Sequence, residues 1–369
     1  MTDYKVSLFW PSIYKDEWLD ELGKIFDTRW LGQGPKVDEF EKEFGKKFGY
    51  EYCVSTNSGT SALELAYHLI GINKEDKVIT SILSCSATSL PLIRKGADII
   101  FTDISKVNLT MDVPDFKKKM NDSIKAIVTV NLGGIMCNPN IYSITKEYDV
   151  PIVIDACQSL GISEKYGDYV AYSFQAIKNF NTFDGGMLIC RNKEDYDRAK
   201  RLRWFGIDRE KKVQNDWKCF SSNREICMDM EEAGYKFHMN DVAATVGLVG
   251  LKHSDEALQY RKEIADIYTN KLMSLPKSKI CECICGGSYW LYGILTENRD
   301  ELIYKLKENG IETDTIHLRN DIFSVFGGKR NDLPNMDWIE SRYLYIPIHT
   351  KMTNEDAYYI TDSIIDILK

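Results

Sequence analysis

Residues 151–191 read PIVIDACQSLGISEKYGDYVAYSFQAIKNFNTFDGGMLICR, and this stretch indicates the fold. It contains three apolar runs, PIVIDA, YVAYSF and GMLICR, which polar turns separate. Continuous runs rich in Val and Ile are typical of strands buried on both faces. We therefore predict three buried strands, with Asp155 at the end of the first and Lys178 in the turn after the second.

Similar apolar runs begin about a hundred residues earlier in the chain. The runs YCVSTNSG, KVITS, ADIIFTDI and KAIVTVNL alternate with helix-period stretches such as TSALELAYHLIG and PNIYSITKEYDV. This alternation predicts an α/β fold with a mostly parallel central sheet flanked by helices. We expect residues 1–250 to form this large domain, together with an N-terminal arm.

The pattern changes near residue 250. A long amphipathic stretch ends at Pro276, and a strand pair, KICECICGGSYWLYGILT, precedes two further helical stretches. We predict a smaller α+β domain over residues 251–369. Cys281, Cys283 and Cys285 alternate, which puts them on one face of a strand, and zinc ligands are usually spaced more widely. A packed strand face is therefore the prediction, with no metal site.

Composition limits the classes of function. The chain has 369 residues, 28% of them charged, and a net charge of −8, which disfavours a nucleic-acid binder. The first residues, MTDYKVSLFWPSIYKDEW, lack the basic-then-apolar order of a signal peptide, and no apolar run approaches a membrane span. We therefore expect a cytoplasmic protein without membrane contact. The ten cysteines fit that compartment as free thiols.

Three features together suggest a cofactor. NSGTSAL, residues 57–63, joins a strand to a helix N-terminus, where free N–H groups bind anions; by itself it reads more simply as an N-cap. The carboxylate of Asp155 needs a partner, either an ordinary donor or a protonated ring nitrogen. Lys178 is either an exposed loop lysine or a desolvated nucleophile. A phosphate cradle, an acid and an amine are what pyridoxal phosphate requires.

Several motifs in order resemble the pyridoxal-phosphate-dependent nucleotide-sugar aminotransferases of the aspartate-aminotransferase-like fold, fold type I. The motifs are WLGQGPKVDEFEKEF, NSGTSALELA, DACQSLG, YSFQAIKN, DGGML, EEAGYKFHMNDVAATVGL and YLYIPIHTKMTNEDAYYI, and they span nearly the whole chain. The resemblance implies that Lys178 forms a Schiff base, that Asp155 pairs with the pyridine nitrogen and that Gln158 lies near the ring O3′. It assigns the phosphate to Gly59, Thr60 and Ser173.

The sequence departs from the family pattern at several positions. Cys85, in SCSATSL, stands where the family usually places an aromatic side chain over the ring. Lys236 replaces an asparagine that contacts the partner subunit's cofactor phosphate, and His238 replaces an arginine. Asn131 stands in a stretch that often carries a histidine. A lysine can still serve a phosphate as a point charge.

The resemblance also implies a substrate side. His317 resembles the family position that helps to receive the nucleotide-linked sugar, and Arg319 is close enough to it in sequence to contact the diphosphate. A solvated loop is the alternative for both. Trp30 borders the expected sugar pocket or anchors packing. The implied enzyme is a homodimer with shared active sites that transfers an amino group from glutamate to a nucleotide-linked keto-deoxysugar, forming a 3- or 4-amino-6-deoxyhexose. A related sugar dehydratase, which typically has histidine in place of the lysine, and a non-catalytic cofactor-binding regulator are the alternatives.

Overall fold

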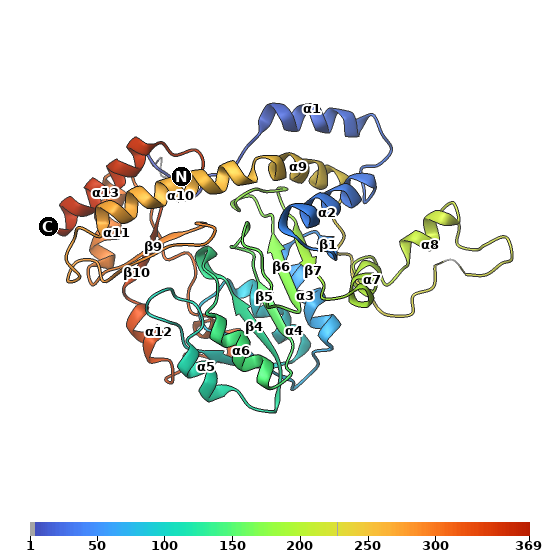
Figure 1. The fold of residues 1–369 in the computed structure, drawn as a ribbon, viewed down its shortest axis with the longest axis horizontal. Coiled ribbons are helices and arrows are strands. Elements are labelled where there is room, and N and C mark those ends of the chain that lie inside the picture. The colour runs from blue at the N-terminus through green and yellow to red at the C-terminus, as the bar shows by residue number, and fades with distance from the viewer. Residues whose placement is uncertain (1–3, 227) are drawn as a thin grey trace.

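A seven-stranded sheet forms the centre of the computed structural model, which describes residues 4–226 and 228–369 (Figure 1). Its strands are β1 (Cys53–Thr56), β2 (Lys77–Ser81), β3 (Asp98–Thr102), β4 (Ile124–Val130), β5 (Ile152–Asp155), β6 (Tyr169–Ser173) and β7 (Gly186–Ile189). Their order is β1-β7-β6-β5-β4-β2-β3, and only β7 runs antiparallel to its neighbours. The predicted α/β class and all seven strands are confirmed.

Helices cover both faces of this sheet because neighbouring residues of its strands point to opposite sides. Ile152 and Ile154 of β5 pack into one core and Val153 into the other. The first core is covered by α2 (Pro35–Phe48), α5 (Val113–Lys119), α6 (Pro139–Glu147) and α9 (Asp241–Lys252). The second is covered by α3 (Gly59–Ile70), α4 (Leu90–Lys95) and α7 (Lys193–Leu202). Helix α1 (Lys15–Phe26) packs on α9 through Trp18.

The C-terminal part forms a smaller antiparallel sheet of order β10-β9-β8. Its strands are β8 (Glu282–Ile284), β9 (Tyr292–Leu295) and β10 (Tyr343–Ile346), and its helices are α10 (Ser254–Leu272), α11 (Arg299–Glu308), α12 (Pro334–Ile339) and α13 (Asn354–Leu368). The predicted strand pair is thus β8 and β9, which a third strand extends. The chain start also packs here, because Val6 pairs with Ile311.

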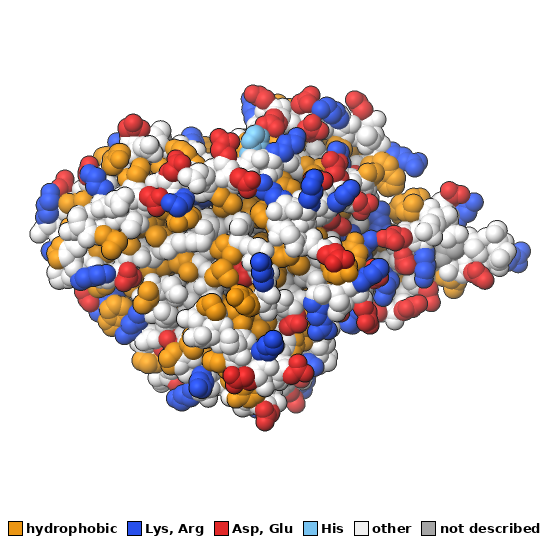
Figure 2. All heavy atoms as spheres, in the orientation of Figure 1, with side chains coloured by type: hydrophobic (Ala, Val, Ile, Leu, Met, Phe, Trp, Pro, Cys, Tyr) orange, Lys and Arg blue, Asp and Glu red, His pale blue; other side chains and the backbone are white. Residues whose placement is uncertain are grey.

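A segment that we call the arm, residues 205–226 and 228–233, projects from the body and carries α8 (Arg209–Gln214) (Figure 1). Figure 2 shows acidic and basic side chains interspersed over the arm and over the face around it. Apolar side chains are exposed along the arm as well: Val213, Trp217, Phe220, Ile226 and Met230. The arm therefore presents apolar surface that its own chain leaves uncovered.

Every described cysteine is a free thiol. Cys283 and Cys285 pack against one hydrophobic core of the C-terminal part, whereas Cys281 packs against another, which contains Trp290. Within residues 4–226 and 228–369, no group of side chains has the composition of a metal site. A helix long and apolar enough to span a membrane is likewise absent from the described chain.

A buried carboxylate makes the stability of this fold depend on pH. Glu164 is 4% exposed. One carboxylate oxygen accepts a hydrogen bond from the amide of Asn131, and the other has no hydrogen-bond partner among the described residues. Burial raises the pKa of Glu164 from its ordinary 4.5 to about 7, against the opposing effect of Asn131. The folded state therefore holds this proton more tightly than the unfolded chain does.

We predict that the free energy of unfolding falls as the pH rises from about 4.5 to about 7, where Glu164 ionises only in the unfolded chain. Glu164→Gln keeps the acceptor without the charge, so it should flatten this dependence and stabilise the protein at pH 8 by roughly 1–3 kcal/mol. Denaturant unfolding across pH measures both effects. The exposed Glu147→Gln is the control, and an unchanged pH dependence in Glu164→Gln would show that another group titrates.

Candidate active site

Asp155 lies at the carboxyl end of β5, where parallel sheets place their ligands. Its side chain is 5% exposed, and it accepts hydrogen bonds from the Thr88 hydroxyl at 2.6 Å and from the Cys157 backbone N–H at 3.1 Å. No lysine or arginine in the described chain forms an ion pair with it. A buried negative charge held only by neutral donors is ready for a cationic partner.

The turn before α3 lies beside this carboxylate. Ser58 caps the helix by accepting from the Ser61 backbone N–H at 3.1 Å, so the simple N-cap interpretation is confirmed. The cap leaves the first backbone N–H groups, at Gly59 and Thr60, free of intrahelical partners. A Cβ at position 59 would lie 2.8 Å from both the Cys157 sulfur and the Cβ of Ser173. Only glycine fits there, and the result is a narrow cradle for an anion.

Lys178 follows β6, the neighbour of β5 in the sheet. Its Nζ lies 3.7 Å from the centre of the Trp290 ring. Burial lowers the pKa of the Lys178 amine below its ordinary value, although Cys157, Cys85 and Asp155 oppose this shift. A lysine with a lowered pKa is a better nucleophile near neutral pH.

Gln158 and His317 meet although 159 residues separate them. The Gln158 amide oxygen accepts from the Gly133 backbone N–H at 2.7 Å, and its Nε2 donates to His317 Nε2 at 3.0 Å. Burial, together with the charge of Lys178, lowers the pKa of His317 to about 3. The imidazole is therefore neutral at physiological pH and acts as an acceptor that fixes the Gln158 amide.

The structure also places residues that the sequence did not indicate. Thr88 lies in the SCSATSL stretch, so its hydroxyl was visible in the sequence, but its bond to Asp155 depends on the fold. Trp290 comes from the C-terminal part and carried no signal beyond its type. Cys85, three residues before Thr88, is exposed and immediately precedes the short 3₁₀ turn Ser86–Thr88.

Arg319, predicted to contact the substrate, is buried and already paired with acidic side chains. Arg319 is 1% exposed, and its guanidinium pairs with both oxygens of Asp321 at 2.6 and 2.8 Å and also bonds Asp337 and Glu340. Its backbone pairs with Leu83. Arg319 is thus neither a solvated loop residue nor a free cation: it anchors its segment on the large sheet.

Trp30 and Lys236 lie toward the arm. The Trp30 ring is 6.2 Å from that of Trp217. Lys236 is exposed, and its Nζ lies 3.3 Å from His238 Nε2. The Lys236 backbone oxygen accepts from the Asn57 side chain at 3.2 Å, which puts this segment beside the phosphate turn of its own chain.

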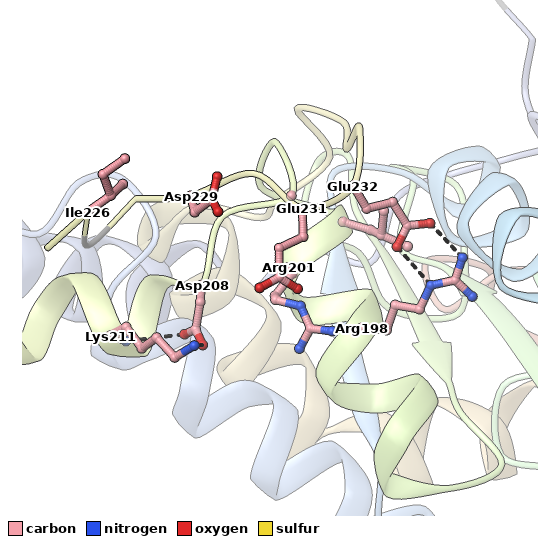
Figure 3. A pocket seen from close by; sticks show the side chains of 10 residues that line it. Arg198, Arg201, Asp208, Lys211, Ile226, Asp229, Glu231 and Glu232 are labelled. Atoms are coloured by element: carbon pink, nitrogen blue, oxygen red, sulfur yellow. Dashed lines mark hydrogen bonds and ion pairs between the residues drawn. The ribbon is translucent and has the colours of Figure 1, made fainter. Parts of the chain in front are cut away.

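A separate hollow of about 480 Å³ lies at the base of the arm, and none of the predicted site residues lines it. Figure 3 shows its charged lining, in which Arg198 bonds both carboxylate oxygens of Glu232. His68 also contacts Glu232, at 2.7 Å. These contacts tie the end of the arm to α3 and α7.

Comparison with known proteins shows the family. Residues 12–365 match the model of the DegT/DnrJ/EryC1/StrS aminotransferase family. The chain belongs to this family. As in the rest of the family, the cofactor of this aminotransferase is pyridoxal phosphate, and the cradle at Gly59, the unneutralised Asp155 and the unpaired amine of Lys178 fit that group.

The aminotransferase is similar to named relatives over nearly its full length. It is 32% identical to the spore coat polysaccharide biosynthesis protein SpsC of Bacillus subtilis, covering 97% of this chain and 96% of that protein. It is 30% identical to a UDP-4-amino-4,6-dideoxy-N-acetyl-beta-L-altrosamine transaminase of Campylobacter jejuni, covering 95% and 94%. The crystal structure of the sugar aminotransferase CalS13 from Micromonospora echinospora superposes with a TM-score of 0.87 at 26% identity, covering 98% and 99%.

The bond between Thr88 and Asp155 generates a prediction. Thr88→Val keeps the shape but removes the donor, and a hydrogen bond to a charged group contributes roughly 1.5–3 kcal/mol. We expect cofactor affinity to fall by about one to two orders of magnitude because Asp155 loses its orientation. Titration with pyridoxal phosphate, followed by absorbance, measures it. Thr80→Val, at a buried hydroxyl without a partner, is the control and should bind normally; equal losses in both variants would refute the role of Thr88.

Proposed function

We propose that this aminotransferase moves an amino group from glutamate to a nucleotide-linked keto-deoxysugar and so produces a 3- or 4-amino-6-deoxyhexose. The observation that carries the proposal is the buried Asp155 carboxylate, held by neutral donors, next to the strand that leads to the unpaired amine of Lys178. Relatives named for perosamine synthesis and for an altrosamine transaminase support a sugar substrate.

Each residue contributes a distinct part of the chemistry. The free N–H groups at Gly59 and Thr60, with Ser173, bind the cofactor phosphate. Asp155 would hold the pyridine nitrogen and favour its protonated form, and the bound cofactor would supply an electron sink for the bond that breaks at Cα. Lys178 would act as the base that takes the Cα proton of the amino donor and as the acid that gives it back, as its lowered pKa favours.

Other side chains shape the pocket. Gln158 is held between Gly133 and His317, and its remaining N–H would serve the ring O3′. Cys85 is exposed, and its sulfur would cover the ring face with less area than an aromatic group offers. We assign His317 and Trp30 to the sugar side. Arg319, whose guanidinium is fully paired, we assign to holding the His317 segment.

We further propose a homodimer in which each site takes Lys236 from the other chain. The exposed apolar side chains of the arm support a second copy as its cover: Phe220 is 56% exposed, Ile226 65% and Met230 59%. Lys236 lies at the base of the arm with its amine exposed. The Lys236 backbone also contacts Asn57, in the phosphate turn of the same chain. The competing arrangement is therefore that Lys236 contacts the cofactor phosphate of its own chain.

The identity of residue 178 distinguishes the aminotransferase from the two alternative functions, a sugar dehydratase and a cofactor-binding regulator. A dehydratase of this type typically has histidine where Lys178 stands, and a regulator would bind the cofactor without turnover. In the aminotransferase, glutamate should bleach the colour of the loaded protein and a keto-sugar should restore it. Colour that glutamate does not change would favour the regulator.

Turnover of the amino donor tests the role of Lys178. Wild-type protein incubated with glutamate and a panel of nucleotide-linked 3-keto- and 4-keto-6-deoxyhexoses should release 2-oxoglutarate with one class of sugar. Lys178→Ala should fold normally and lose activity by roughly three orders of magnitude or more, because it removes the proton carrier and the covalent anchor. Coupled detection of 2-oxoglutarate measures both. The remote Lys351→Ala should remain active, and full activity in Lys178→Ala would refute the assignment.

Mixing two inactive variants tests whether each site is shared between two chains. If Lys178→Ala and Lys236→Ala are each strongly impaired, subunit exchange between them should restore about a quarter of all sites. Half of the dimers are then mixed, and each mixed dimer has one intact site. Activity after proven exchange measures this. No recovery would mean that Lys236 serves its own chain, and an active Lys236→Ala would remove it from the site altogether.

A further inference from the structure

Trp290 lies between β8 and β9 of the C-terminal part and reaches the large domain. Its side chain is 1% exposed, and its indole N–H donates to the backbone oxygen of Ile177 at 3.0 Å. Phe9 stacks on it with 5.7 Å between ring centres. The indole is therefore fixed against the residue that precedes Lys178.

The face of this indole holds the Lys178 amine. Nζ lies 3.7 Å from the ring centre, and in the described chain it makes no hydrogen bond or ion pair. Nevertheless an acid lies at the same sheet edge: Asp155 pairs in register with Ala171 on β6, the strand that leads to Lys178. Asp155 attracts the Lys178 ammonium and raises the pKa of its amine, yet here each side chain has a neutral partner.

We propose that Trp290 is a positioning residue that seats the Lys178 ammonium on its ring face and so keeps it from pairing with Asp155 in the cofactor-free enzyme. This inference rests on the proposed roles of Lys178 and Asp155. An ion pair between the two would occupy the carboxylate that must face the pyridine nitrogen. It would also hold the proton on the amine, which must be lost before the nitrogen can attack the cofactor aldehyde.

The indole suits this task because its electron-rich face attracts an ammonium while offering no proton acceptor. The seated amine can lose its proton, add to the aldehyde carbon and expel the carbonyl oxygen as water. The titratable groups that face Lys178 are Asp155, Cys157, Cys85 and His317. His317 stays neutral, and burial raises the pKa of the Cys157 thiol and so favours its uncharged form. Asp155 is therefore the acid that competes for the Lys178 amine.

The test follows the attachment of pyridoxal phosphate to cofactor-free protein by absorbance, as a function of pH. Trp290→Met removes the ring and allows the ion pair, so the pH profile should move up by about one unit and attachment at pH 7.5 should slow about tenfold. Trp290→Phe keeps a ring face and should stay within about twofold of wild type. Adding Asp155→Asn to Trp290→Met should move the profile back down, because no acid remains to pair.

Trp10→Leu is the matched control: it removes another lysine–tryptophan contact, with Lys351 Nζ at 3.3 Å, and should change nothing. A wild-type profile in Trp290→Met, or one shifted to lower pH, would overturn the proposal. Equal slowing in the Phe and Met variants would also overturn it, because the ring face would then be irrelevant. Trp290→Leu provides a second ring-free variant should the Met variant not fold. Wild-type protein that attaches no cofactor at Lys178 would contradict the proposed function instead.

Discussion

The constraint on which the site depends is a buried carboxylate without a cationic partner. Asp155 ends a strand covered on both faces, and within the described residues its hydrogen-bond donors are the Thr88 hydroxyl and the Cys157 backbone N–H. Removing a charge from water in this way is costly. In the proposed function a protonated ring nitrogen would offset this cost, and the buried carboxylate would then favour binding of the cofactor.

The C-terminal part contributes aromatic side chains to the candidate active site. Trp290 and His317, whose rings stack at 6.2 Å, bring an aromatic wall against Lys178 and Gln158. The segment that carries His317 is held beside the large sheet by its backbone: Asn320 N–H donates to the Ile82 oxygen at 2.8 Å, and Arg319 pairs with Leu83. The ion pairs of the Arg319 side chain join this segment to the rest of the C-terminal part, at Asp337 and Glu340. Movement between the two parts would therefore change the surroundings of the lysine.

The features that could be predicted from the sequence are those that local chemistry determines. Strands buried on both faces must be apolar throughout, so β1–β7 were visible, and Asp155 and Lys178 stood out as charges at strand ends. The ring-stacking position of Trp290 was not visible, because a buried tryptophan in a loop resembles any core residue. Its role depends on a contact with a lysine more than a hundred positions earlier.

The partners of Arg319 also could not be predicted from the sequence. A basic residue in a polar loop resembles an anion ligand, and its partners follow 2, 18 and 21 positions later in the chain. Only the folded arrangement of Asp321, Asp337 and Glu340 shows that its charge is already neutralised. Thr88 was similarly hidden, because a threonine in a turn usually caps or bonds its own backbone.

The most direct test of the central claim is to locate the covalent bond. Pyridoxal phosphate is added to the purified protein, the bond is reduced with borohydride, and the peptides are mapped by mass spectrometry. The account predicts that the added mass lies on the peptide that contains Lys178, and that Lys178→Ala carries no adduct. An adduct on another lysine of the wild-type chain, with Lys178 unmodified, would contradict it.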